Sequence, residues 1–178
     1  MRVVAGSARG RRLVTPAGAA TRPTADRVRE ATFNALASLD AVDGATVLDL
    51  FAGSGAMGIE ALSRGAATAT FVDRDPRALA AVRANLAATG LADRATVVRA
   101  EAARWLSLAG RFDVAVLDPP YAMADAMWSR LLGDLDAEVA VLESDRTLAL
   151  PARWGILRSR EYGGSVVVLA RASRPAER

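Results

Sequence analysis

Residues 118–121 (DPPY) form the most chemically specific pattern in the chain, directly after an apolar run typical of a buried strand. Two prolines cannot continue a central strand, so the chain must leave the sheet there, with Asp118 and the Pro119 carbonyl held rigidly. Two such acceptors beside the flat ring of Tyr121 suit an aromatic exocyclic amine. Accepting its N–H hydrogens frees the nitrogen lone pair to attack an electrophilic methyl group, mainly through positioning and electrostatics. A strand-exit turn with a buried tyrosine is the alternative.

A glycine-rich loop follows an earlier strand pattern, in residues 49–58 (DLFAGSGAMG). Gly53 and Gly55 let the backbone approach a ligand closely, and Gly58 lets the next helix lie near the strand. Asp49 ends that strand, where a carboxylate repels a dinucleotide pyrophosphate and attracts a cation. This favours S-adenosylmethionine (SAM), which carries a sulfonium and an ammonium but no phosphate. In the alternative, Asp49 caps the helix and the glycines only form a turn.

Two further acids follow predicted strands. Asp73 lies 18 residues beyond Gly55, near the spacing of an acid that accepts hydrogen bonds from ribose hydroxyls, which also fits NAD. Glu101 stands where its carboxylate could meet an adenine edge, or where it simply starts a helix. Asp75 precedes Pro76 and is interpreted as a helix N-cap.

Strand and helix patterns alternate from residue 45 onward. Strands are predicted at 45–50, 67–73, 95–99, 112–118 and 138–143, with helices at 54–64, 76–89, 101–108 and 125–135 between them. This alternation predicts a parallel sheet with helices on both faces. Residues 154–162 and 165–171 are predicted to form an antiparallel hairpin joined by two glycines.

The beginning of the chain departs from this alternation. Residues 1–6 and 11–15 are predicted to pair as a hairpin around a turn at 7–10, and Thr24 to cap a helix that runs to about Leu39. We therefore expect one domain over residues 1–178, with a basic extension at 1–23, a core at 24–171 and a tail at 172–178.

The 178-residue chain contains no Cys and no His. This excludes disulfides, His-dependent nucleophilic triads and thiolate or imidazole metal sites, and we expect no metal. No apolar run reaches the roughly 18 residues that would span a membrane, and the N-terminus lacks the apolar region of a signal peptide. We expect a soluble, cytoplasmic monomer without a membrane partner.

All 23 basic residues are arginine, and their distribution is uneven. Residues 1–25 contain five arginines and no acid, residues 26–150 contain 12 arginines against 18 acids, and residues 151–178 contain six against two. A basic head and tail on an acidic body suggest a polyanion held at one edge. Solvated, loosely ordered ends are the alternative.

Taken together, these patterns resemble one family. Asp49 with residues 51–55, Asp73 and residues 118–121 are similar to the motif set of Rossmann-like, SAM-dependent methyltransferases that act on amino groups. The RsmD family is resembled more specifically in residues 1–6 (MRVVAG), 10–13 (GRRL), Pro16, 21–24 (TRPT), 26–30 (DRVRE), Phe33, Asn34 and 58–66 (GIEALSRGA). The likeness runs from Met1 to about Arg171, which is nearly the whole chain.

The resemblance implies SAM-dependent methylation of N2 of one guanine, G966 of bacterial 16S rRNA, preferably within the assembled 30S subunit. It implies a seven-stranded, mostly parallel sheet with a C-terminal antiparallel hairpin. Asp118, Pro119 and Tyr121 would hold the extruded base for in-line methyl transfer. The cofactor would be bound by Asp49, Phe51, Gly53, Gly55, Asp73 and Glu101, although Asp or Asn is more usual than Glu at the last position.

The same resemblance implies that basic residues near the N-terminus face RNA, namely Arg11, Arg12, Arg22, Arg27 and Arg29. Helix ion pairs with Asp26 or Glu30 are the alternative, chiefly for Arg29.

Three other functions are weighed against this one. An amino-methyltransferase acting on adenine N6 or a protein glutamine amide would more often have Asn in place of Asp118. A non-catalytic RNA-binding module is disfavoured by the intact glycine loop and DPPY sequence. An NAD-dependent oxidoreductase is disfavoured by Asp49 and by the lack of His and Lys.

Overall fold

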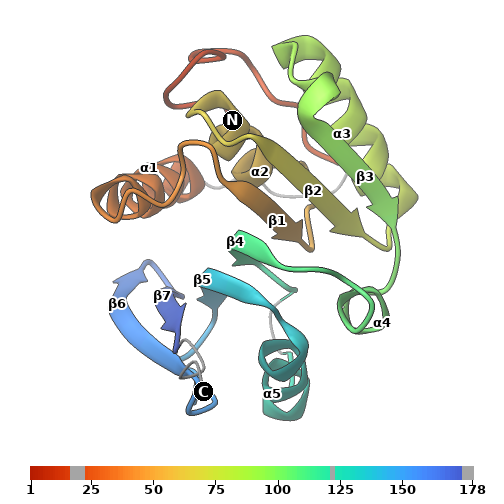
Figure 1. Ribbon diagram of the computed structural model, residues 1–178. Helices are drawn as coiled ribbons and strands as arrows, with labels where there is room; N and C mark the ends of the chain where they lie inside the picture. The colour runs from red at the N-terminus through yellow and green to blue at the C-terminus, as the bar shows by residue number, and fades with distance from the viewer. Residues whose placement is uncertain (17–22, 121–122, 174–178) are drawn as a thin grey trace.

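The computed structural model describes residues 1–16, 23–120 and 123–173 (Figure 1). These residues contain a seven-stranded sheet with the order β3-β2-β1-β4-β5-β7-β6. The strands are β1 (Thr46–Leu50), β2 (Thr68–Asp73), β3 (Ala95–Arg99), β4 (Phe112–Leu117), β5 (Ala137–Ser144), β6 (Trp154–Tyr162) and β7 (Ser165–Ala172). β1 to β5 run parallel, and the β6–β7 hairpin joins β5 in antiparallel fashion through β7. The predicted α/β fold and its C-terminal hairpin are confirmed.

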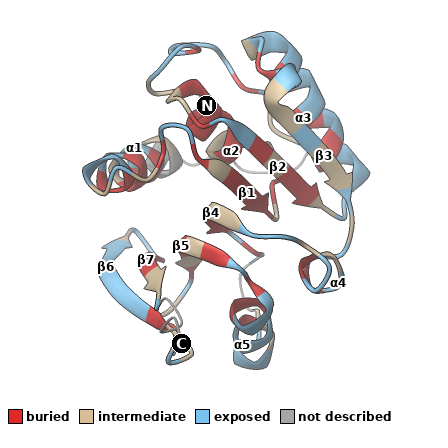
Figure 2. Ribbon diagram, in the orientation of Figure 1, coloured by how far each residue is buried: buried red, intermediate tan, exposed pale blue. Residues whose placement is uncertain are grey.

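Helices cover both faces of this sheet. One face carries α1 (Pro23–Ser38), α2 (Ala56–Ser63) and α3 (Pro76–Thr89), and the other carries α4 (Ala102–Leu106) and α5 (Asp125–Asp134). Successive strand residues alternate between two apolar clusters, so Val47 packs with the first helix group and Leu48 with the second. The central strand β1 is almost wholly buried (Figure 2). Burial on both faces explains why the central strands are nearly continuous apolar runs. The 3-10 helix η1 (Ala92–Arg94), which precedes β3, was not predicted.

Residues 1–16, the N-terminal arm, form the predicted hairpin in shortened form. Its two segments pair through one antiparallel bridge between Arg2 and Arg12, with backbone hydrogen bonds from Val3 to Arg11, from Gly10 to Val3 and from Leu13 to Met1. The pairing does not extend into two regular strands. The N–H groups of Val4 and Ala5 donate instead to the two carboxylate oxygens of Glu60, at 2.8 and 3.0 Å.

Two more buried polar side chains hold the arm against α2 and α3. The hydroxyl of Ser63 accepts from the N–H of Ala8 at 3.0 Å. The amide of Asn85 accepts from the N–H of Val14 at 2.8 Å and donates to its carbonyl at 2.9 Å. The arm is therefore part of the packed fold, which argues against a loosely ordered head.

Several element boundaries differ from expectation. α1 begins at Pro23, so Thr24 lies inside the helix and is not its N-cap, and α4 ends at Leu106, two residues before the predicted end. α2 begins at Ala56 because Gly55, with φ 75°, has a left-handed conformation that a helix interior excludes. Ala172 belongs to β7 and the N–H of Ser173 donates to the Arg153 carbonyl, so the tail predicted from residue 172 is shorter; residues 174–178 lie outside the described structure. Within the described ranges, no helix has the length and apolarity needed to cross a membrane.

Candidate active site

A cavity of about 970 Å³ opens at the carboxyl ends of the parallel strands. Its walls come from the glycine loop after β1, the ends of β2, β4 and β5, the start of β7, α1 and the arm. Ligands of open α/β sheets bind at this edge. The predicted residues Asp49, Asp73, Glu101 and Asp118 all line this one cavity, as do Phe51, Gly53 and Pro119.

Strand register places four acids on the same side of the sheet. Asp49 pairs with Phe71 of β2 and with Val116 of β4, so Asp73 and Asp118, each two residues further on, lie on the face that Asp49 occupies. Leu117 pairs with Leu142 of β5, which places Glu143 beside Asp118. All four side chains therefore lie on the α1–α2–α3 face of the sheet.

Gly53 and Gly55 have φ angles of 55° and 75°, in the left-handed region that favours glycine, and Phe51, at 66°, has the same conformation, which the sequence did not predict. Gly53 lines the cavity, whereas Gly55 does not: its Cβ position faces Val82 and Phe71, at 3.1 and 3.2 Å. A Cβ on Gly58 would lie 2.4 Å from a ring carbon of Phe71, so only glycine lets α2 approach β2 this closely. The predicted packing role of Gly58 is therefore confirmed.

Asp49 caps α2 and also lines the cavity, so the two interpretations that the sequence left open are compatible. One carboxylate oxygen accepts from the N–H of Gly58 at 2.8 Å, in the first turn of α2, so it caps that helix from the neighbouring strand. The side chain is buried at 3 % exposure and lines the cavity. Burial raises its pKa to about 7, the Gly58 hydrogen bond opposes this shift, and Asp73 adds to it.

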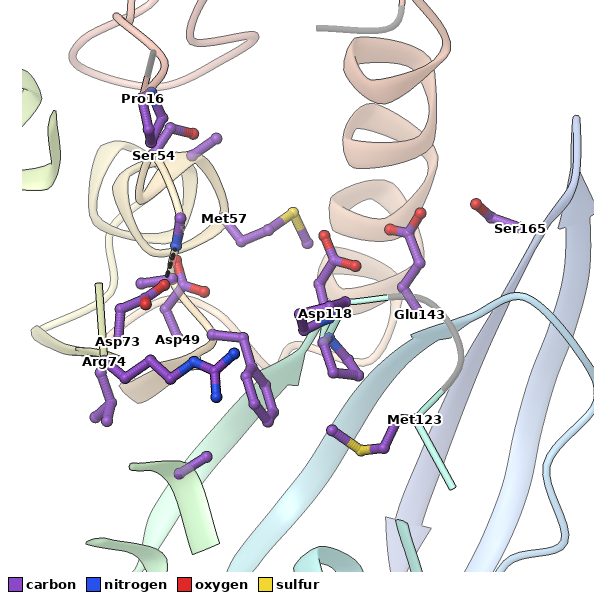
Figure 3. Close-up of a pocket in the computed structure, with 18 of the residues that line it drawn as sticks. Pro16, Asp49, Ser54, Met57, Asp73, Arg74, Asp118, Met123, Glu143 and Ser165 are labelled. Carbon is purple, nitrogen blue, oxygen red and sulfur yellow. Dashed lines mark hydrogen bonds between the residues drawn. The ribbon is translucent and has the colours of Figure 1, made fainter. Parts of the chain in front are cut away.

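Backbone donors also orient Asp73 and Glu101. Asp73 accepts from the N–H of Gly53 at 2.9 Å and from that of Asp75 at 2.9 Å, which ties the end of β2 to the glycine loop (Figure 3). Asp75 caps α3, as predicted. Glu101 caps α4 through Ala103 and Arg104, and these bonds lower its pKa; it also lines the cavity, so capping and an adenine contact are compatible.

Asp118 and Glu143 project side by side into the cavity from the ends of β4 and β5 (Figure 3). The Asp118 side chain is open to solvent from the cavity, yet protein walls surround it on its other sides. This enclosure raises its pKa to about 7, with the charges of Glu143 and Asp49 adding to the effect. Pro119 is buried behind it. Tyr121 lies outside the described residues, so its predicted stacking role stays a prediction.

Sequence reasoning missed Glu143, although a signal was present. β2, β4 and β5 each finish at an acid, in FVD, VLD and VLE, and the first two were interpreted as functional. Met57 and Met123 also line the cavity beside Asp118. Ser165 lies on the opposite side of Glu143.

The arginines expected to face RNA fall into three groups. Arg11, Arg12 and Arg27 are exposed, and Arg22 lies outside the described residues. The expectation for Arg29 is corrected: its side chain is 3 % exposed and forms ion pairs with Asp26 at 3.0 Å and Glu60 at 3.5 Å. The helix ion-pair alternative holds at that position through Asp26, and Arg29 is also a cationic partner of the buried Glu60 of α2.

The loop and its acids fit SAM better than a dinucleotide. The Cβ position of Gly53 is open apart from one oxygen at 3.9 Å, so a ligand can approach the backbone there. Asp49 and Asp73 flank the loop, and two carboxylates at this point disfavour a pyrophosphate while favouring a cation and hydroxyl donors.

Solved structures define the class of protein. The putative methyltransferase yhhF from Escherichia coli is 34 % identical with a TM-score of 0.85, over 98 % of this chain and 99 % of that one. The Thermus thermophilus protein TTHA0928 is 36 % identical with a TM-score of 0.83, over 97 % and 99 %. The fold is that of a Rossmann-like methyltransferase.

Sequence relatives narrow the class to a family. The family model "Conserved hypothetical protein 95" matches residues 1–171. The putative rRNA methyltransferase YlbH of Bacillus subtilis is 42 % identical over 176 residues, which cover 92 % of this chain and 94 % of YlbH. The ribosomal RNA small subunit methyltransferase D of Escherichia coli K12 is 35 % identical over 181 residues, which cover 92 % and 85 %. The chain belongs to the RsmD family of SAM-dependent rRNA methyltransferases.

Proposed function

We propose that this protein methylates N2 of a single guanine in 16S rRNA, at the position of G966, within the bacterial small ribosomal subunit. The proposed enzyme is a cytoplasmic monomer. The observation that carries the proposal is that Asp118 and Pro119, directly after β4, line the same cavity as the glycine loop. Membership in the rRNA methyltransferase family supports the substrate class.

The chain supplies positioning and a proton acceptor. Asp118 and the Pro119 carbonyl accept the two N2 hydrogens, which favours a pyramidal nitrogen whose lone pair points away from the acceptors. Loss of one hydrogen must accompany methylation at this nitrogen. Asp118, whose pKa is raised to about 7, is matched to accept that proton near neutral pH. Tyr121 is proposed to stack on the base.

Asp49, Phe51, Gly53, Gly55, Asp73 and Glu101 are proposed to hold the methyl donor. When bound, SAM supplies an electrophilic methyl group on its sulfonium. Asp73 is oriented by Gly53 so that an oxygen can accept from ribose hydroxyls, and Asp49 places negative charge beneath the loop. Arg11, Arg12, Arg22 and Arg27 are proposed to contact RNA phosphates around the cavity mouth.

The test is methyl transfer from labelled SAM to small subunits that lack their natural methylations, followed by mass spectrometry of the labelled nucleoside. We expect N2-methylguanosine at one position, with none in Asp118→Ala. As a matched control, Asp93→Ala removes an exposed acid of η1, away from the cavity, and should transfer at the wild-type rate. Labelled N6-methyladenosine, or methylated protein, would contradict the proposal.

A further inference from the structure

The carboxyl ends of β4 and β5 present more acceptors than amine activation requires. Asp118 and Glu143 occupy paired register positions, one residue beyond the Leu117–Leu142 pair, on strands that neighbour each other at about 4.8 Å. Their carboxylates project in the same direction into the cavity (Figure 3). One ligand edge can therefore meet both.

Neither carboxylate has a protein donor within the described residues. Asp49, Asp73 and Glu101 each accept backbone N–H bonds, whereas no hydrogen bond or ion pair to Asp118 or Glu143 is found in the described ranges. Asp118 is exposed and Glu143 is partly exposed to the cavity, so water can solvate both carboxylates in the free protein, while the two adjacent charges repel each other. A ligand that displaces this water must offer a donor to each carboxylate, and therefore at least two donors on one edge.

We propose that Glu143 is a specificity-determining residue that accepts the N1–H of the target guanine, while Asp118 accepts from its N2 amine. Guanine places N1–H and N2–H₂ next to each other on its Watson–Crick edge, which enzymes read on an extruded base. Adenine has an unprotonated N1, so its lone pair would face the Glu143 carboxylate. Repulsion there rejects adenine even if its amine could reach Asp118. This inference rests on the proposed function and adds the basis of base selection.

The discriminating probe is 2,6-diaminopurine, which keeps the N2 amine of guanine but carries no hydrogen on N1. Small subunits are reconstituted with 16S rRNA that has either guanine or 2,6-diaminopurine at the methylated position, and kcat/KM is measured for each. We expect wild-type enzyme to prefer guanine by roughly 10- to 100-fold, the range of a good base-reading contact.

The Glu143→Gln variant tests directly whether Glu143 causes the preference for guanine over 2,6-diaminopurine. The glutamine amide can accept from N1–H or donate to an unprotonated N1, so the ratio of the two kcat/KM values should fall close to one. Glu138→Gln makes the same substitution at the opposite end of β5, among residues that line a separate pocket, and should keep the wild-type ratio. SAM binding by calorimetry should be unchanged in both variants.

The outcomes separate this inference from the proposed function. If wild-type enzyme has equal kcat/KM values for guanine and 2,6-diaminopurine, the proposed hydrogen bond to N1–H is overturned, whatever the variants show. A Glu143→Gln enzyme that keeps the wild-type ratio would overturn it as well. Absence of any guanine methylation by wild-type enzyme would instead overturn the proposed function, and the inference with it.

Discussion

The acids in the two halves of the cavity differ in their hydrogen-bond partners. In the half around β1 and β2, Asp49, Asp73 and Glu101 are each held by backbone N–H groups of the loop or helix that follows. In the half around β4 and β5, Asp118 and Glu143 face the cavity without a donor from the described part of the chain. The same residue types, at the same edge of the same sheet, therefore have different degrees of hydrogen bonding.

This difference indicates how binding and chemistry are divided. Acids that the backbone already orients form a preorganised cradle, and they lose little freedom when a ligand binds. Asp118, which lacks a donor from the described part of the chain and whose pKa is raised to about 7, is poised to change protonation or to accept hydrogens from a substrate. We expect the first half to bind SAM, which changes only by losing its methyl group. We expect the second half to bind the amine that gains this methyl group.

The largest expected effect is a separation of binding from transfer. Asp118→Ala should lower the single-turnover rate by at least about 100-fold and leave the SAM dissociation constant nearly unchanged. Asp73→Ala should weaken SAM binding by roughly 10- to 100-fold, because bonds between ribose hydroxyls and a carboxylate are lost. Calorimetry and rapid-quench transfer assays measure the two quantities. Parallel losses of both quantities in both variants would remove the proposed division.

Disruption of the packing between α2 and β2, next to the glycine loop, should lower the stability of the fold. Gly58→Ala places a Cβ 2.4 Å from the Phe71 ring, and such overpacking costs about 1–3 kcal/mol of unfolding free energy. Gly133→Ala is the matched control, because a Cβ there meets nothing within 4 Å in α5 and should stabilise slightly. Urea unfolding of both variants gives the comparison. An unaffected Gly58→Ala protein would contradict the tight β2–α2 packing.

The exposed arginines of the arm should affect RNA binding but not SAM binding or the acids of the cavity. We expect Arg11→Ala with Arg12→Ala to weaken rRNA binding several-fold and to reduce the slope of log affinity against log salt by about one per lost phosphate contact. Arg83→Ala, an exposed position on α3, controls for loss of positive charge. SAM affinity should stay the same. If the double variant keeps the wild-type slope of log affinity against log salt, Arg11 and Arg12 are solvated surface residues that do not contact RNA phosphates.

The smallest expected effect is a pH-dependent gain in stability. The folded pKa of Asp118 is about 7, above its ordinary value of 3.8, so the folded state holds this proton more tightly than the unfolded state does. Its contribution to stability is therefore lost as pH rises toward and through 7. Asp118→Asn, which carries no charge, should raise the thermal midpoint by a few degrees at pH 8 and by less at pH 5. Asp93→Asn should shift the midpoint equally at both pH values.

Local signals predicted the core well. The predicted helix 76–89 coincides with α3 because Asp75 caps it, Pro76 occupies its first position, and Gly90 ends it with φ 72°. The strands were predictable because the alternation of apolar runs and helices permits few topologies. Asp49, Asp73 and Asp118 were predictable as cavity residues since each stands at or near the end of an apolar strand.

The arm and the partner of Arg29 were not predictable, because both depend on contacts distant in sequence. Glu60 lies 56 residues from Val4, to which it bonds, and no local pattern marks it as buried. The buried Glu60 draws Arg29 inward as a cationic partner and binds the arm through the N–H groups of Val4 and Ala5. Glu143 carried a sequence signal, an acid at the end of an apolar strand, but its place beside Asp118 follows from the register of β4 against β5, which the sequence does not reveal.

The attachment of the arm to Glu60, Ser63 and Asn85 also sets an order of assembly. These partners lie some 55 to 71 residues downstream of the backbone groups they bind. Loops of that length close late, after the local helices and strands have formed, because the entropy of closure precedes the reward of the contacts. A nascent chain that has not yet reached α3 therefore exposes Arg11 and Arg12 on an unanchored segment. The position of the basic residues on the arm therefore depends on α2 and α3, which lie downstream of the arm in the chain.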